Sequence, residues 1–345
     1  MPPQIAWPSA ERQAHFERWL ASVAAQHGLD SATLCLASAD ASFRRYLRIQ
    51  GREGSLIVMD APPPQEDVRP FVHVAGLIAN AGLHAPRVLQ ADTTQGFLLL
   101  TDLGDRQYLP ALQAASEAQC ETLMRAALSA LVRWQQHVVA DSLPVFDAAQ
   151  IARELDLFPE WCVQAEFGQT WTDAQKTAWK GVVDLLTRDL LAQPTVAVHS
   201  DWMPRNLMVC EQGPGILDFQ DAVRGPITYD LASLLRDAYV SWEEARQLDW
   251  AVRWWQEARA AGAPVDSDFG EFWRQLEWTG LQRHLRILGV FCRLKHRDGK
   301  PAYAQELPRF FGYATQVAMR YRPLAPLLRL LEPLSGAAVK AGYTF

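Results

Sequence analysis

The sequence predicts an α+β protein of two lobes, a small N-terminal lobe built on an antiparallel sheet and a larger, mostly helical C-terminal lobe. The chain has 345 residues, which is too long for one small core. Paired β-type runs with turn signals between them gather before residue 104. Helical spacing of apolar residues dominates after residue 117. We therefore expect one lobe over residues 1–103 and the other over residues 104–345.

The N-terminal lobe is expected to begin with an amphipathic helix. In residues 11–27, Phe16, Leu20 and Val23 recur at helical spacing, and Gly28 ends the pattern. The other elements expected in this lobe are a hairpin of strands 37–50 and 55–59 around the turn 51–54, a helix over 68–82, and a strand pair at 85–92 and 96–104.

The C-terminal lobe is expected to hold helices around a few short strands near residue 218. The expected helices cover residues 121–138, 151–166, 172–191, 230–239 and 277–294. A tryptophan-rich span runs from Trp242 to Trp278, and its indoles are expected in the helical core.

Composition excludes several classes of protein. The net charge of −6 argues against nucleic-acid or membrane-surface binding, which usually needs a basic face. The five cysteines are scattered without a C-x-x-C pair, so neither a disulfide framework nor a zinc site is indicated. There is no leader-like start and no long apolar run. We expect a cytoplasmic monomer.

Residues 199–218 carry the most specific pattern in the chain. Asp201 is followed five positions later by Asn206, and Asp218 ends an apolar run that starts at Gly215. Phosphoryl transfer needs a carboxylate that orients and deprotonates the attacking hydroxyl, and oxygen ligands for a magnesium ion. Asp201 fits the first role, and Asn206 and Asp218 fit the second. A lone Asp-x-x-x-x-Asn is common on loops, but the whole combination in this order is far more specific.

This pattern, H-x-D-x-x-x-x-N followed by Asp-Phe, resembles the catalytic loop and metal-binding Asp of protein kinases. The third motif is Asp-Phe-Gln, and the loop is not H-R-D, so the chain is more similar to the aminoglycoside and choline phosphotransferase superfamily. That superfamily often has H-G-D-x-H-P-x-N. This chain keeps Pro204 but has Ser200 and Met203 at the variable positions. The resemblance implies a protein-kinase-like fold, with ATP and Mg²⁺ as cofactors.

The same resemblance assigns nucleotide contacts to the N-terminal lobe. The hairpin would lie over ATP, with Ser42 in the turn that covers the phosphates. Thr101, Asp102 and Leu103 would form the hinge that holds adenine.

The lysine that usually pairs with the α- and β-phosphates is absent, because none of the five lysines precedes Lys176. Arg44 and Arg48 share one face of their strand, since side chains alternate, and are candidates to replace it. The alternative is that both are ordinary solvated strand arginines.

A narrower resemblance covers nearly the whole chain. The segments that carry it are Ala41 to Arg48, Val58 to Pro63, Asp218 to Ala222, Gly225 to Tyr239 and Gly280 to Phe291. Together they resemble the bacterial anomeric kinases of N-acetylmuramate and N-acetylglucosamine. This implies ATP-dependent phosphorylation of the C1 hydroxyl to the α-1-phosphate, in peptidoglycan recycling toward UDP-N-acetylmuramate. An anomeric hydroxyl is more acidic than an ordinary alcohol, so one carboxylate can serve as its base.

The remaining site residues are assigned through the same resemblance. Asp221 is the candidate for binding sugar hydroxyls. Polar and aromatic groups of one apolar helix are candidates for the sugar wall: Trp278, Gln282, Arg283 and His284. The alternative for this helix is that its polar groups brace the catalytic loop. His199 is expected to pack beneath that loop, and Asp230 to hydrogen-bond its backbone.

Three other functions stay open. A kinase for an aminoglycoside, choline or another sugar would share the catalytic residues, and only substrate profiling separates it. A pseudokinase is suggested by the missing lysine and would show no ATP turnover. An adaptor protein would not need Asp201, Asn206 and Asp218 in register.

Overall fold

The computed structural model describes residues 5–39 and 43–335. Ser42, expected in the turn over the phosphates, lies outside the described residues. Contacts divide the chain into two compact units. Unit 1 comprises residues up to 139 together with 199–222, and unit 2 comprises 140–198 and the residues from 223 onward. The lobe boundary at residues 103 and 104 stays a prediction.

Unit 1 is built on a five-stranded antiparallel sheet with the order β1-β2-β3-β5-β4. Its strands are β1 Asp30–Ala39, β2 Arg45–Gly51, β3 Gly54–Asp60, β4 Val88–Asp92 and β5 Phe97–Thr101. A second, two-stranded sheet pairs β7 Leu207–Cys210 with β8 Gly213–Ile216. The helices of this unit are α1 Ala10–His27, α2 Arg69–Asn80, α3 Tyr108–Gln113 and α4 Glu117–His137.

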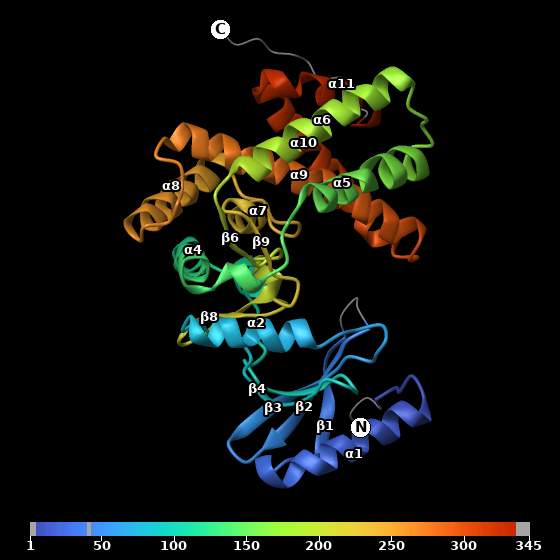
Figure 1. Ribbon diagram of the computed structural model, residues 1–345, viewed down its shortest axis with the longest axis vertical. Helices are drawn as coiled ribbons and strands as arrows, with labels where there is room; N and C mark the ends of the chain where they lie inside the picture. The colour runs from blue at the N-terminus through green and yellow to red at the C-terminus, as the bar shows by residue number, and fades with distance from the viewer. Residues whose placement is uncertain (1–4, 40–42, 336–345) are drawn as a thin grey trace. The chain divides into compact units, whose positions relative to one another are not determined.

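Helices α1 and α2 lie on opposite sides of the five-stranded sheet (Figure 1). Phe16 and Leu20 of α1 pack on one face, against a buried cluster that includes Leu47, Val58 and Phe97. The helix ends where the sequence predicts, because Gly28 adopts φ +62°, a left-handed conformation that favours glycine. On the opposite face, toward α2, Tyr46 and Arg48 of β2 line a cavity.

The hairpin prediction was right in its second strand and wrong in the extent of its first. Residues 37–50 are not one strand: β1 ends at residue 39 and β2 begins at Arg45. Strand β1 pairs with β2 through two register shifts, so Asp30 lies opposite Gln50 while Cys35 lies opposite Arg48. Such bulges break the two-residue alternation by which a strand is recognised in a sequence.

Unit 2 is mostly helical, as the sequence predicts. Its two strands, β6 Thr195–Val198 and β9 Val223–Pro226, form an antiparallel pair. Its helices are α5 Ala148–Leu157, a π-helix Phe158–Glu166, α6 Asp173–Ala192, α7 Tyr229–Leu235, α8 Glu244–Ala260, α9 Phe269–His296, α10 Leu307–Arg320 and α11 Ala325–Ser335. The expected helix 151–166 is therefore α5 continued by the π-helix, in which Pro159 cannot donate a backbone hydrogen bond.

Of the tryptophans expected in the core of unit 2, Trp250, Trp254 and Trp278 are buried, whereas Trp255 and Trp273 are only partly buried. Trp250 and Trp254 of α8 are fully buried, and Trp254 stacks on Phe272 of α9. Among the described residues, no helix combines the length and apolar character that a membrane crossing requires. The α+β architecture, an antiparallel sheet plus a mostly helical remainder, confirms the predicted fold class.

Candidate active site

The catalytic loop begins directly after β6 and is organised by the buried ring of His199. Its Nε2 lies 3.0 Å from the carbonyl oxygen of Leu217, and the backbone N–H of Asp201 donates to its Nδ1 over 3.2 Å. One ring nitrogen therefore donates and the other accepts, which is the bonding of a neutral imidazole. Burial lowers the pKa of His199, in agreement with that form. The ring joins the loop of Asp201 to the segment that precedes Asp218.

His199 also packs against two indoles, in edge contacts with Trp134 and Trp202. The role of His199 as the support beneath the catalytic loop stays a prediction.

The backbone at Ser200 and Asp218 is left-handed, with φ of +80° and +59°. These are the only two non-glycine residues in the described part of the chain with positive φ. This conformation is strained for a residue with a Cβ, although Asp tolerates it better than most. The structure thus explains why related loops often have glycine at position 200. Here the Ser200 hydroxyl donates to the carbonyl oxygen of Asp221 at 3.1 Å.

Asn206 ends a short 3₁₀ turn, Pro204–Asn206, and its amide nitrogen donates to the carbonyl oxygen of Asp201 at 3.0 Å. The N–H of Leu217 in turn donates to the carbonyl oxygen of Asn206 at 2.9 Å. These bonds fix Asn206 between the loop that carries Asp201 and the segment at Leu217. They also use the amide nitrogen, so its oxygen is left as an acceptor.

An amide oxygen and a carboxylate are the hard oxygen ligands that Mg²⁺ prefers, so Asn206 and Asp218 fit a magnesium ion chemically. The metal role of both residues stays a prediction.

The charges at Asp218 are balanced by groups from three segments. Burial raises the pKa of Asp218, and the charge of Asp201 raises it further. A 3.0 Å hydrogen bond from Gln220 and the guanidinium of Arg44 oppose this rise. A bound cation would stabilise the ionised carboxylate in the same way.

The hinge predicted at residues 101–103 is held by Arg48. Its Nε donates to Asp102 Oδ2 at 2.6 Å, and its Nη2 donates to Asp102 Oδ1 and to the carbonyl oxygen of Gly104. Burial opposes ionisation of Asp102, but hydrogen bonds from Arg48 and Ser55 outweigh it and lower the pKa. This bidentate pair clamps β2 to the segment after β5.

A cavity of about 350 Å³ within unit 1 connects the hinge to the catalytic segments. Its lining includes Thr101, Asp102 and Leu103 of the predicted hinge together with Asn206 and Asp218. The predicted hinge and metal residues, far apart in the sequence, therefore meet around one cavity. Sequence reasoning missed other lining side chains: Tyr46, Ile57, Phe71, Gln107, Arg205, Met208 and Phe219. Strand alternation could have found Tyr46, because it lies two positions before Arg48.

The candidate sugar residues are divided between the two units. Asp221 is exposed in unit 1 and accepts a hydrogen bond from Gln220 at 2.7 Å. The other four residues lie on α9 in unit 2 and are each at most 5% exposed: Trp278, Gln282, Arg283 and His284.

Gln282 donates to Glu154, Arg283 donates to Ser233, and the His284 ring bonds the carbonyl oxygen of Arg236. These contacts brace the helical core. Asp230 is fully buried at the start of α7 in unit 2. A contact of any of these residues with the sugar or the catalytic loop stays a prediction.

The fold and the cavity fit a phosphotransferase, and comparison with known proteins shows that class. Residues 33–265 match the phosphotransferase enzyme family (APH), so the chain belongs to that family. Curated relatives named N-acetylmuramate/N-acetylglucosamine kinase are 49% identical over 307 residues in Pseudomonas aeruginosa and 46% identical over 338 residues in Neisseria meningitidis. These matches cover 89% and 97% of this chain and 90% and 100% of the relatives.

Solved structures support the kinase-like fold. Choline kinase LicA from Streptococcus pneumoniae superposes with a TM-score of 0.62 at 12% identity, over 88% of this chain and 99% of that one. ADP-bound aminoglycoside phosphotransferase APH(2'')-Ib gives 0.56 at 14% identity, over 90% and 99%. The predicted membership in the aminoglycoside and choline phosphotransferase group is confirmed, and with it a kinase-like fold.

Proposed function

We propose that this protein is an ATP-dependent kinase that phosphorylates the anomeric C1 hydroxyl of N-acetylmuramate and N-acetylglucosamine to the α-1-phosphate. The observation that carries the proposal is the single cavity lined both by the hinge at residues 101–103 and by Asn206 and Asp218. A nucleotide with adenine at the hinge would have its phosphates at the carboxylate end. The names of the relatives supply the sugar class.

Asp201 is the base of the proposed reaction. It accepts the proton of the C1 hydroxyl as that oxygen bonds to the γ-phosphorus, and the bond from phosphorus to the bridging oxygen breaks. ADP leaves with the electron pair of that bond, and the proton passes from Asp201 to water. A divalent metal, bound by Asn206 and Asp218, would neutralise charge on the transferred phosphoryl group.

Asp201 is prepared for this role by its backbone. Its N–H is held by His199, and its carbonyl oxygen accepts from the side chain of Asn206 and the N–H of Met203. The carboxylate is therefore carried on a loop fixed on both sides, which limits the motion that would misplace a base.

The sugar contacts proposed here begin with Asp221, because it is exposed and three residues from Asp218. Trp278, Gln282, Arg283 and His284 stay candidates for the sugar wall, and the structure buries all four in α9. The proposed kinase acts as a cytoplasmic monomer in peptidoglycan recycling, on a small molecule and without nucleic-acid or membrane partners.

The test is ³¹P NMR of the purified protein with magnesium, ATP and either amino sugar. We expect a sugar 1-phosphate signal in the wild type and none with Asp201→Asn, which keeps the shape of the side chain and removes the base. The variant should still bind ATP, because the hinge and both proposed metal ligands remain. ADP formation only with another acceptor would move the protein to a sister kinase, and no turnover with any acceptor would favour a pseudokinase.

A further inference from the structure

A second cavity of unit 1 shares the predicted hinge with the nucleotide cavity but includes none of the proposed catalytic or metal residues. Its volume is about 760 Å³, within the range of about 300–1,000 Å³ that is common for small-molecule sites. Thr101, Asp102 and Leu103 line both cavities. The rest of its lining comes from α2, α4, the connector between α2 and β4, and the turn between β7 and β8, so we call it the α2–α4 cavity.

The connector between α2 and β4 lines this cavity and is fixed at three points. The carbonyl oxygen of Gly82 accepts from Nη2 of Arg133 on α4 at 2.6 Å. That of His84 accepts from a backbone N–H of β8 at 2.8 Å. Arg87 donates its N–H to Thr101 Oγ1 at 2.9 Å, and its carbonyl oxygen accepts from the N–H of Thr101 at 3.0 Å. This part of the cavity is therefore already ordered, which lowers the cost of binding a ligand there.

The lining carries two guanidinium groups, those of Arg87 and Arg133. Among the described residues, neither lies in an ion pair, and the side chain of Arg87 makes no hydrogen bond. Asp102 is the one acidic residue of the described lining, and Arg48 already bonds both of its carboxylate oxygens. The cavity thus has an excess of positive charge, in a chain whose net charge is −6. Such a local field favours an anion.

The ring of His84 is a third polar group of the same lining. Its Nδ1 is buried, and no described residue offers it a hydrogen bond. A buried nitrogen without a partner is unfavourable. The ring would therefore gain a hydrogen bond if it turned toward an oxygen atom of a ligand.

The two helices add small apolar side chains to the lining. These recur at helical spacing and are Ala75, Ile78 and Ala79 on α2 and Ala126 and Ala130 on α4. Alanine at four of these positions leaves space that larger side chains would fill. The cavity thus combines cationic groups with an apolar wall, which suits a ligand that has a charged head and a compact apolar body.

We propose that the α2–α4 cavity is a second ligand site, which binds a small organic phosphate independently of the nucleotide and sugar sites. A guanidinium binds two oxygens of one phosphate through parallel hydrogen bonds, and a phosphate monoester carries enough negative charge for both Arg87 and Arg133. The apolar wall then contacts its organic group. Because Thr101 to Leu103 line both cavities, the bound phosphate lies against the hinge of the nucleotide site.

The experiment is calorimetry of the full chain with phenyl phosphate, which joins a phosphate to a compact apolar ring. Magnesium and saturating ADP are present, so that the nucleotide cavity is filled. We expect saturable binding with a dissociation constant of about 1 mM or less. Inorganic phosphate should bind more weakly, because it lacks the group that contacts the apolar wall.

Arg87→Met should weaken phenyl phosphate by about tenfold and leave the affinity for ADP unchanged. It should also fold normally, since this exposed side chain has no bond to lose within the described chain. Arg87→Lys should recover part of the loss. The matched control is Arg18→Met, exposed on α1, which should change neither affinity.

The apolar wall is tested separately with Ala79→Leu, which fills part of the cavity from an exposed position of α2. It should weaken phenyl phosphate and leave inorganic phosphate unchanged. Equal weakening of both would contradict the proposed contact with the organic group.

Absence of saturation up to about 10 mM phenyl phosphate, or wild-type affinity in both Arg87→Met and Arg133→Met, would overturn the proposal. Displacement of phenyl phosphate by ADP would assign it to the nucleotide cavity and would overturn the proposal as well. A parent protein that binds no ADP would count against the proposed function alone. In that case the titration without ADP, with Arg87→Met as the comparison, still decides whether the α2–α4 cavity binds the phosphate.

Discussion

Gly215 of β8 provides a direct test of where adenine binds. A Cβ placed on this residue would lie 2.7 Å from Leu103 Cδ1, 3.1 Å from Cys210 Sγ and 3.2 Å from Met208 Cβ. Carbon atoms pack best at about 3.5–4.0 Å, so Leu103 must move by about 1 Å in Gly215→Ala. Leu103 and Met208 both line the cavity assigned to the nucleotide.

The penalty should fall on ATP binding more than on folding. The new methyl group would push against the end of the Leu103 side chain, which is flexible. When the cavity holds no nucleotide, this side chain has room to move. Adenine needs the same volume. Overpacking of this kind costs about 1–3 kcal/mol, so we expect the KM for ATP to rise by about tenfold, equivalent to about 1.4 kcal/mol, with kcat nearly unchanged.

The assay is steady-state phosphorylation with varied ATP at saturating sugar, beside thermal denaturation. Gly76→Ala is the matched control, because Gly76 is exposed on α2 and its added Cβ would meet no atom within 4 Å. It should leave the KM unchanged. A Gly215→Ala enzyme with the wild-type KM for ATP and a lowered kcat or melting temperature would refute this placement of adenine.

Two further predictions concern unit 2. Burial lowers the pKa of His284 to about 3, whereas the same imidazole in the unfolded chain is protonated below about pH 6.5. Below that pH the unfolded chain binds a proton that the folded chain does not bind. The free energy of unfolding should therefore fall by about 1.4 kcal/mol per pH unit below 6.5. His284→Gln should therefore lose about 2 kcal/mol less than the wild type between pH 7 and pH 5 in denaturant titrations, and an equal loss would contradict the linkage. Gly289→Ala should lower the melting temperature, because its Cβ would lie 2.4 Å from the backbone of Leu157. In Gly181→Ala the added Cβ would meet no atom within 4 Å, so the free energy of unfolding should rise by about 0.5–1 kcal/mol. A change of stability in the same direction for both glycine variants would contradict the packing argument.

The parts of the site that the sequence predicts best are those specified over a few residues. Asp201 and Asn206 are five positions apart, and the bonds that fix them run within the loop itself or to the segment at Leu217. Helix α1 is similarly local, since its apolar spacing and Gly28 define it completely. Strand β1 could not be recognised in this way, because its bulges are defined only by the partner strand.

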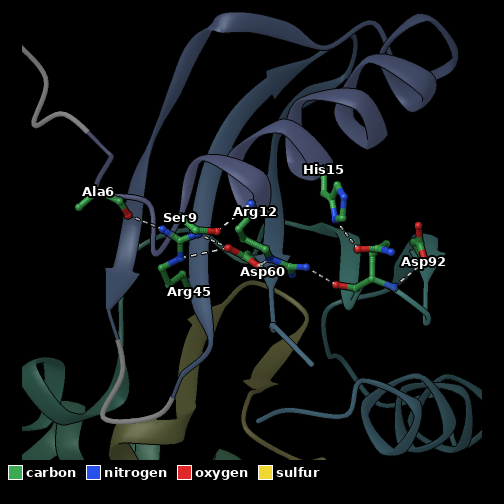
Figure 2. A network of polar contacts seen from close by, with 8 residues as sticks. Ala6, Ser9, Arg12, His15, Arg45, Asp60 and Asp92 are labelled. Atoms are coloured by element: carbon green, nitrogen blue, oxygen red, sulfur yellow. Dashed lines mark hydrogen bonds and ion pairs between the residues drawn. The ribbon is translucent and has the colours of Figure 1, made fainter. Parts of the chain in front are cut away.

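The contacts of Arg44 and Arg48 could not be predicted from the sequence because their partners are distant along the chain. Arg48 bonds a residue 54 positions away, and Arg44 approaches one 174 positions away. Arg44 also lies just before β2, which begins at Arg45, so the strand alternation expected over both arginines does not extend to it. The pairing of buried Asp60 with Arg12 of α1 could not be predicted for the same reason, since an acid before a Pro-rich loop is typical of a turn, and only the tertiary fold brings Arg12 to it (Figure 2).

Ser200 shows how a loop accommodates a residue that its backbone disfavours. A left-handed residue with a Cβ costs about 1–3 kcal/mol, and glycine would avoid most of that. Yet this backbone turns the N–H of Asp201 onto His199, and the serine hydroxyl adds a bond to Asp221, the residue proposed to bind the sugar. The strain is therefore compensated by contacts on both sides of the proposed base. Serine replaces glycine here at a modest cost, and it links the catalytic loop to the segment that carries Asp218 and Asp221.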